Sequence, residues 1–274
     1  MRINKVKNFD KSHLNRFPET VKPKKSLGQH FLIDQNIAQK IVKQLSTDHD
    51  KVIEVGAGMG VLTQYLLPEL KEKLVVVEID SESVAYLSEH FPELRTNLIE
   101  VDFLRTKLTD FSAENIGIIG NFPYNISSQI FFHIIDYKEI VTEVVGMVQK
   151  EVAERLSSPP GKKAYGILSV LLQAWYDIEY LFTVNENVFN PPPKVKSAVI
   201  RLRRNNTKKL NCDEILFKKI IKQAFNQRRK TLRNSLRPLL NAEIIENKIF
   251  DKRPEQLRVD EFIVLTNLIY EKEI

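Results

Sequence analysis

Cysteine is almost absent from this chain of 274 residues, where Cys212 stands alone. A single thiol excludes an internal disulfide, and no group of cysteines and histidines has the spacing of a zinc site. The chain also lacks a run of about 18 apolar residues, the length that a helix needs to cross a membrane. Residues 1–25 are basic and polar and lack the apolar stretch of a secretory signal. We therefore expect a cytoplasmic protein without a metal or a membrane partner.

Acidic residues are missing from one basic segment, although the whole chain has 41 basic and 35 acidic side chains and a formal charge of +6. Between Lys218 and Arg237 there are eight lysines or arginines and no aspartate or glutamate. Residues 1–25 hold eight more, against Asp10 and Glu19. Two basic segments on a nearly neutral body indicate a polyanionic partner. Taken singly, each could instead be a solvated face or a polar tail.

Short apolar segments alternate with helical patterns over the first half of the chain. We expect strands at 51–55, 74–79, 98–101, 116–120 and 141–148, and helices at 36–45, 61–70, 81–91 and 127–135. Asp80 is placed to cap the third of these helices. Strands that alternate with helices are typical of βαβ units, so the sequence predicts an α/β fold with a parallel sheet.

The composition changes after Arg204, where residues 205–209 are typical of a linker. Helical patterns follow at 213–226, 229–240, 242–249 and 260–270, without a convincing strand. We therefore predict three parts: a basic N-terminal tail (1–23), an α/β domain (24–205) and a small all-helical domain (206–274).

A glycine-rich turn, Glu54-Val-Gly56-Ala-Gly58-Met-Gly60, follows the first expected core strand. Glycines there allow the backbone to bend sharply and to approach a ligand closely. A dinucleotide fingerprint is Gly-x-Gly-x-x-Gly, whereas the spacing here is Gly-x-Gly-x-Gly. The spacing favours S-adenosylmethionine, which has no phosphate, with Gly56 and Gly58 as cofactor-binding residues. A tight turn between strand and helix is the simpler alternative.

Two acidic residues follow the next two strands. Glu78 ends the second strand, 20 residues after Gly58, and is placed to accept hydrogen bonds from both ribose hydroxyls of a cofactor. Asp102 follows the third strand and could accept one from the adenine amino group. Either acid alone is better explained as a helix cap. Their order at successive strand ends, where open α/β sheets bind ligands, favours a cofactor site.

The tetrapeptide Asn121-Phe122-Pro123-Tyr124 follows the fourth strand. The Asn121 amide oxygen and the carbonyl of Phe122 or Pro123 can accept both hydrogens of an exocyclic amino group, while the Tyr124 ring stacks on the base. These bonds would stabilise the positive charge that grows on the nitrogen during methylation, so no strong base is required. The base must leave its stack to enter such a pocket. A plain turn is the alternative for the tetrapeptide alone.

Several further segments resemble those of one family and occur in the same order. They are Lys24–Leu32, Val52–Gly60, Asn121–Ser127, Gln149–Arg155, Ala164–Gly166, Phe189–Val195, Phe225–Thr231 and Arg233–Leu236. From about Lys24 to Leu240 the chain resembles the small-subunit ribosomal RNA adenine dimethyltransferases of the KsgA type. The last two segments are similar to this family rather than to the related resistance methyltransferases of large-subunit RNA.

The resemblance implies an S-adenosylmethionine-dependent, Rossmann-like methyltransferase sheet with a small all-helical C-terminal domain. The cofactor contacts that it implies are at His30, Leu32, Gly56, Glu78, Asp102 and Asn121. The residues expected to act in catalysis are Asn121, Pro123, Tyr124 and Phe189, and the resemblance places Phe189 against the other face of the target base. His30 departs from the family, which more often has asparagine there, and Phe122 stands where leucine is usual.

The reaction that this resemblance implies is the transfer of methyl groups to the 6-amino groups of two adjacent adenines. They would lie in the 3′-terminal hairpin loop of 16S rRNA within a pre-30S particle, and we expect a monomeric enzyme. Three alternatives stay open: a large-subunit RNA methyltransferase, a DNA adenine methyltransferase, and an assembly factor that binds RNA without catalysis.

The basic C-terminal segment supplies the expected RNA-binding residues, which are Lys218, Lys222, Arg228, Arg229, Lys230 and Arg233. In one unbroken helix, Lys218, Lys222, Arg229 and Arg233 would lie within about 60° of one another. Such a stripe could follow an RNA backbone. Asn226 or Asn234 could instead end the helix.

Overall fold

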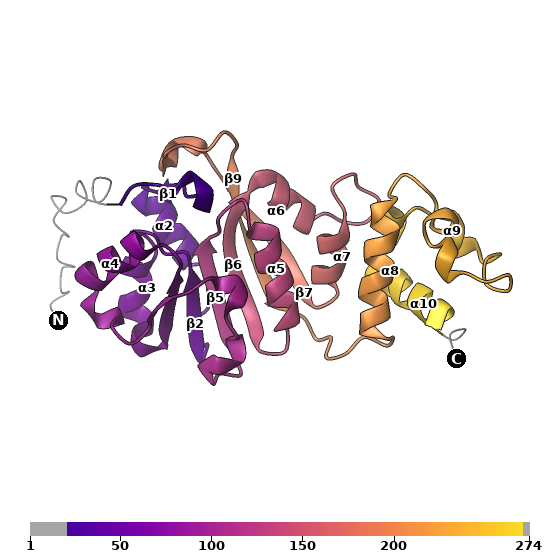
Figure 1. Ribbon diagram of the computed structural model, residues 1–274, viewed down its shortest axis with the longest axis horizontal. Helices are drawn as coiled ribbons and strands as arrows, with labels where there is room; N and C mark the ends of the chain where they lie inside the picture. Colours follow the sequence, from indigo (N-terminus) through magenta and orange to yellow (C-terminus); the bar gives the residue numbers. More distant parts are fainter. Residues whose placement is uncertain (1–20, 271–274) are drawn as a thin grey trace, which may run out of the picture.

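The computed structural model describes residues 21–270, so most of the predicted basic tail (1–23) lies outside the described residues. Figure 1 shows a central sheet with helices packed around it, and α8, α9 and α10 gathered at one end of the molecule. The strands are β1 (Phe31–Leu32), β2 (Lys51–Val55), β3 (Leu74–Glu78), β4 (Leu98–Glu100), β5 (Ile116–Asn121), β6 (Val141–Gln149), β7 (Tyr176–Val184), β8 (Phe189–Asn190) and β9 (Ser197–Arg204). The α-helices are α2 (Gln35–Val42), α3 (Thr63–Leu70), α4 (Ser81–His90), α5 (Ser127–Asp136), α6 (Lys150–Leu156), α7 (Ile167–Gln173), α8 (Glu214–Asn226), α9 (Leu232–Ser235) and α10 (Val259–Tyr270).

The central sheet has the strand order β4-β3-β2-β5-β6-β9-β7. The strands from β4 to β6 run parallel, as predicted, whereas β9, a strand that was not predicted, runs antiparallel to both of its neighbours. Residues 185–196, which connect β7 to β9, contain a short 3-10 helix and β8 but no crossover α-helix, as is usual between antiparallel neighbours. As a result, the first residue of β9 lies at the edge where the parallel strands end.

The sheet is buried on both faces, because alternate residues of a strand point to opposite sides. On β2, Ile53 and Val55 join one apolar cluster with α5 and α7. Val52 joins a second cluster, which contains residues of α2, α3 and α4. The strands therefore have apolar side chains on both sides, which explains why their near-continuous apolar runs could be recognised in the sequence.

The C-terminal helices differ from the prediction in the middle of their region. α8 and α10 form as expected, but α9 is a single short turn within the predicted helix 229–240, and residues 242–247 form turns. The cause lies in contacts distant along the chain, since the Leu232 amide donates to the Lys252 carbonyl at 2.8 Å. α8 packs on the sheet-bearing part, with the Phe217 and Trp175 rings 6.3 Å apart. The division at 205/206 stays a prediction.

A buried polar cluster lies at the edge of the sheet opposite to the strand ends discussed below. The Glu143 carboxylate accepts hydrogen bonds from the Ser46 amide at 2.8 Å, Arg203 Nε at 2.8 Å and His49 Nε2 at 3.1 Å. Burial alone would raise the pKa of Glu143, but these bonds lower it to about 2. Burial alone would lower the pKa of His49, but its bonds to Glu143 and Asn115 raise it. The Glu143 carboxylate is therefore ionised and hydrogen-bonded at neutral pH.

The hydrogen bonds of Glu143 predict how the free energy of unfolding depends on pH. Because the folded-state pKa of Glu143 is depressed, its contribution is present above about pH 4.5 and is lost as the pH falls toward about 2. Between about pH 5 and pH 3, roughly the window of that titration, we expect the free energy of unfolding to fall less steeply in Glu143→Gln than in the wild type. Urea denaturation at a series of pH values measures this difference. Glu139→Gln, which removes a carboxylate that is 65% exposed, is the matched control. Parallel curves for the wild type and Glu143→Gln would contradict the assignment.

Among residues 21–270, no helix is both long and apolar enough to cross a membrane.

Candidate functional site

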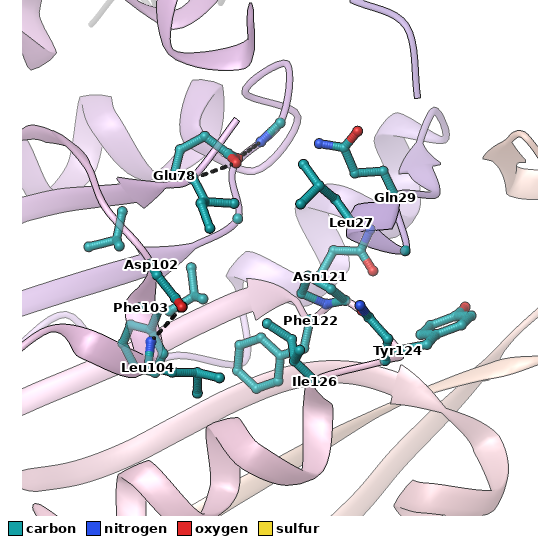
Figure 2. A pocket seen from close by; sticks show the side chains of 18 of the residues that line it. Leu27, Gln29, Glu78, Asp102, Phe103, Leu104, Asn121, Phe122, Tyr124 and Ile126 are labelled. Carbon is teal, nitrogen blue, oxygen red and sulfur yellow. Dashed lines mark hydrogen bonds between the residues drawn. The ribbon is translucent and has the colours of Figure 1, made fainter. Parts of the chain in front are cut away.

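A cavity of about 290 Å³ opens at the carboxyl ends of β2, β3 and β5. It brings together five of the residues that the sequence predicts at a cofactor site, namely Gly56, Gly58, Glu78, Asp102 and Asn121. Figure 2 shows Glu78, Asp102 and Asn121 around this cavity, with Tyr124 beyond Asn121. The opposite wall is the segment from Ser26 to Phe31. Strand ends that adjoin in the sheet thus collect side chains that are far apart in the sequence.

The glycine turn forms the floor of the cavity and needs its glycines. Gly56 and Gly58 have φ angles of 70° and 57°, a region in which side chains other than glycine are strained. A Cβ atom on Gly58 would come within 2.8 Å of the Phe31 ring. At Gly56 such a Cβ would be in ordinary contact with Pro123 Cδ at 3.9 Å, so the positive φ rather than a clash favours glycine there. The backbone here can therefore approach a ligand closely.

Glu78 is fixed by the backbone around it. Its Oε2 accepts a hydrogen bond from the Gly58 amide at 2.9 Å, and its Oε1 accepts from the amides of Ile79 and Asp80, both at 2.9 Å. The residue is 3% exposed, and burial raises its pKa although the three amide bonds act in the opposite direction. Each carboxylate oxygen has two lone pairs, so at least one remains on Oε2 for a ligand hydroxyl.

Asp102 combines the two roles that the sequence leaves open. Its Oδ1 accepts from the Leu104 amide at 3.0 Å and so caps the short turn Phe103–Arg105. The residue also lines the cavity, together with the apolar side chains of Val101, Phe103 and Leu104. A carboxylate beside an apolar wall suits a flat heterocycle that has a donor at its edge.

The Asn121 amide is oriented by one hydrogen bond. Its Nδ2 donates to the His30 carbonyl at 2.8 Å, which leaves Oδ1 as an acceptor at the cavity. Of the two candidate carbonyls, that of Pro123 already accepts from the Ile126 amide at 3.2 Å. No amide of residues 21–270 donates to the Phe122 carbonyl, so the Phe122 carbonyl is the better second acceptor. The Phe122 ring is buried against Phe131, with centroids 5.9 Å apart.

Tyr124 lines the cavity next to the Asn121 amide. Its hydroxyl forms a hydrogen bond with Ser197 Oγ at 2.5 Å, and its ring centroid lies 5.4 Å from that of His30. Burial raises the pKa of Tyr124, with the Ser197 bond acting in the opposite direction, so the phenol is neutral at neutral pH. The site therefore offers two oxygen acceptors and an aromatic ring, which suits a planar base with an exocyclic amino group.

The sequence model of the family "Ribosomal RNA adenine dimethylase" matches residues 20–269. The chain belongs to this family. It is 58% identical over 257 residues to the "Ribosomal RNA small subunit methyltransferase A" of Parabacteroides distasonis. The aligned region covers 93% of this chain and 96% of that protein. The protein of the same name from Bacteroides fragilis is 59% identical over 254 residues, with coverages of 91% and 93%.

Solved structures are similar in fold. A dimethyladenosine transferase from Plasmodium falciparum superposes with a TM-score of 0.74 at 24% identity, covering 88% of this chain and 98% of that one. The 23S rRNA methyltransferase ErmE has a TM-score of 0.63 at 23% identity, with coverages of 86% and 99%. The predicted Rossmann-like methyltransferase fold with a helical C-terminal part is therefore confirmed.

The family resemblance also implied roles for His30, Leu32 and Phe189, and the structure places these three residues in different surroundings. His30 lines the cavity, and its Nδ1 lies 2.7 Å from the Pro191 carbonyl oxygen. Leu32 and Phe189 pair across β1 and β8, and each is 3% exposed in the apolar core. Phe189 does not line the cavity, whereas Leu32 lines a smaller one that shares Gly56, Gly58 and Asn121 with it. A contact of Phe189 with a base stays a prediction.

Sequence reasoning missed the contacts that hold the segment Lys24–Leu32 in place. Lys24 Nζ pairs with Asp80, and Gln29 Nε2 donates to Asp80 Oδ2 at 3.1 Å. Asp80 was predicted as a helix cap, and it does accept from the Glu82 amide at 3.4 Å. Lys24 also lies 3.1 Å from Glu82. Nothing in the local pattern of Lys24 or Gln29 indicates a partner more than fifty residues away.

Glu54, at the start of the glycine turn, also makes a contact that the sequence did not indicate. Its Oε2 accepts from Thr63 Oγ1 at 2.7 Å, while Oε1 is buried without a hydrogen-bond partner among the described residues. Burial raises the pKa of Glu54 to about 8, so the carboxyl is largely protonated at neutral pH. A protonated carboxyl can hold Thr63 at the start of α3 without an uncompensated buried charge.

The predicted stripe of basic residues does not form on one helix, because α8 ends at Asn226 and turns follow. Several of its members are engaged elsewhere. Lys218 pairs with Asp136 at 3.2 Å, Arg228 donates to the Lys162 carbonyl at 3.3 Å, and Arg233 pairs with Asp251 at 2.6 Å. Lys222 Nζ lies 5.7 Å from the Phe132 ring centroid. Arg229 and Lys230 are exposed and make no side-chain hydrogen bond or ion pair with the described residues.

Among residues 21–270, no three histidine, cysteine, aspartate or glutamate side chains are grouped as a metal ion would require.

Proposed function

We propose that this enzyme transfers methyl groups from S-adenosylmethionine to the 6-amino groups of two adjacent adenines in the 3′-terminal hairpin loop of small-subunit rRNA. The observation that carries the proposal is the arrangement of two oxygen acceptors, Asn121 Oδ1 and Phe122 O, beside the Tyr124 ring at a cavity lined by Glu78 and Asp102. The small-subunit relatives support the choice of RNA. The sequence also predicts that the rRNA is bound in a pre-30S particle, by a single copy of the enzyme, in the cytoplasm.

The residues of the cavity fit this cofactor. Glu78 offers a buried carboxylate for ribose hydroxyls, Asp102 offers an acceptor beside an apolar wall for the adenine, and Gly56 lines the cavity without a side chain. When bound, S-adenosylmethionine supplies a methyl group that is already activated. The site therefore needs orientation rather than a strong base, in agreement with a cavity in which His30 is the one histidine among the lining residues described.

The target amino group would be held from two sides. Asn121 Oδ1 and the Phe122 carbonyl accept its hydrogens, which turns the nitrogen lone pair out of the base plane and stabilises the growing positive charge. Tyr124 keeps the base in plane by stacking. The Asn121 amide cannot rotate freely, because its Nδ2 is bonded to the His30 carbonyl at 2.8 Å.

Arg229 and Lys230 are the best remaining candidates for phosphate contacts, because they are exposed and unpaired. We expect Arg229→Ala with Lys230→Ala to weaken binding of the small subunit and to reduce the log–log salt slope by about one to two units. Lys43→Ala with Arg95→Ala removes the same charge from exposed positions elsewhere and is the control. Equal affinity and slope for the wild type and the Arg229 and Lys230 variant would remove these residues from the RNA interface.

The experiment that tests the function compares substrates. Purified enzyme with labelled cofactor is offered unmethylated small subunits, large subunits and duplex DNA. Transfer to the small subunit alone is expected. Preference for large subunits or for DNA would replace the proposal with the corresponding methyltransferase activity, and tight small-subunit binding without transfer would indicate an assembly factor.

A further inference from the structure

We propose that Ser197 is a positioning residue: it holds the Tyr124 ring in the orientation in which the target base stacks. The proposal deepens the proposed function and rests on it for the stacking role. It starts from one contact, the hydrogen bond of 2.5 Å between the Tyr124 hydroxyl and Ser197 Oγ. Neither the Asn121–Tyr124 motif nor the cavity lining includes Ser197.

Ser197 is a rigid anchor. It is 0% exposed and begins β9, where its backbone is paired on one side with Gln149 of β6 and on the other with Val184 of β7. Because β9 runs opposite to the parallel strands, its first residue lies at the edge where β5 ends and the cavity opens. The reversed strand is therefore what brings a serine hydroxyl within reach of Tyr124.

Tyr124 is held at both ends by this arrangement. At the backbone end, Ser127 Oγ donates to the Tyr124 carbonyl at 3.2 Å, and the turn is closed by the Ile126 amide and the Pro123 carbonyl, also at 3.2 Å. At the other end the hydroxyl is bonded to Ser197, which fixes the direction of the ring. The His30 ring, 5.4 Å away and tilted by 30°, limits rotation about the ring axis. The ring is therefore in place before a base arrives.

A preorganised ring contributes to rate, because an aligned base needs no further ordering before reaction. We expect Ser197→Ala to slow single-turnover methyl transfer about 2- to 13-fold, the range for loss of one neutral hydrogen bond. Tyr124→Phe, which keeps the ring and removes the same bond from the other side, should slow it by a similar factor. Tyr124→Ala, which removes the ring itself, should be slower than both.

The decisive test is the double variant. If the two groups act through one hydrogen bond, Ser197→Ala with Tyr124→Phe is no slower than the slower single variant. If Ser197 only supports the start of β9, the two factors multiply, and the proposal is overturned. Ser235→Ala is the matched control, because Ser235 is also 0% exposed but its hydroxyl has no hydrogen-bond partner among the described residues. It should react at the wild-type rate.

A readout without RNA separates this proposal from the function. In protein labelled with ¹³C-tyrosine, the ring signal of Tyr124 is assigned by its absence in Tyr124→Phe. Ser197→Ala should shift and broaden that signal, whereas Ser235→Ala should leave it unchanged. An unchanged signal in folded Ser197→Ala would overturn the tether even if the enzyme methylates RNA as proposed. A shifted signal would support it even if the substrate proved to be another nucleic acid.

Discussion

Replacing Asn121 with alanine is expected to lower the single-turnover rate of methyl transfer about 10²- to 10³-fold at saturating cofactor, the usual effect of losing one preorganised partner of a developing charge. The side chain supplies an oxygen acceptor at the cavity, and its Nδ2 bond to the His30 carbonyl at 2.8 Å holds that acceptor in place. Binding of the small subunit should be little changed, because the proposed phosphate contacts lie on the C-terminal region.

Asn121→Asp is the informative companion variant. It keeps an oxygen acceptor but places a carboxylate oxygen against the His30 carbonyl, where the Nδ2 donor now stands. Rapid-quench measurements with excess enzyme should find it slower than the wild type, because the acceptor is no longer held in position. A near-normal rate for Asn121→Ala at saturating cofactor would show that the Asn121 oxygen does not contact the reacting amine.

Replacing Glu78 with alanine is expected to weaken cofactor binding roughly 10- to 150-fold, which corresponds to the loss of charge-assisted hydrogen bonds of about 1.5–3 kcal/mol. The carboxylate is buried at the cavity and is held by the amides of Gly58, Ile79 and Asp80. Because those amides also lose their acceptor, the variant should unfold at a lower temperature than the wild type.

Isothermal titration calorimetry measures the affinity, and thermal unfolding confirms that the variant is folded. Glu100→Ala is the matched control, since Glu100 lies opposite Glu78 in the register of β3 and β4 but is exposed and does not line the cavity. Unaltered cofactor affinity in folded Glu78→Ala would remove Glu78 from the cofactor site.

The parallel core of the fold could be predicted because its strands are buried on both faces. Such strands are near-continuous apolar runs, and each is followed by a recognisable turn or helix cap. β7 was not predicted, although the alternation of Tyr176, Ile178 and Tyr180 with Asp177 and Glu179 is the pattern of a half-buried edge strand. The reversed direction of β9 depends on its pairing with β6 and β7, which no local pattern contains.

Site residues could be predicted where a functional side chain lies at the end of a recognisable strand. Contacts between segments that are distant in the sequence could not. Glu78, Asp102 and Asn121 line one cavity because β3, β4 and β5 are parallel strands that end at the same edge of the sheet. Leu32 and Phe189 share a strand pair that turns both into the core, and Ser197 reaches Tyr124 across 73 positions of sequence. The basic segment could not be resolved from composition, because Arg233 and Lys218 are paired with acids brought close by the fold.

The central claim is tested most directly by mapping the product on the RNA. Unmethylated small subunits are incubated with enzyme and cofactor, and the 3′-terminal fragment of the rRNA is analysed by mass spectrometry. The account predicts two adjacent N6,N6-dimethyladenosines in the hairpin loop and no change elsewhere, with neither residue formed by Asn121→Ala. Methyl groups on a different base or in another region of the RNA would contradict it. Equal methylation by Asn121→Ala and by the wild type would also contradict it.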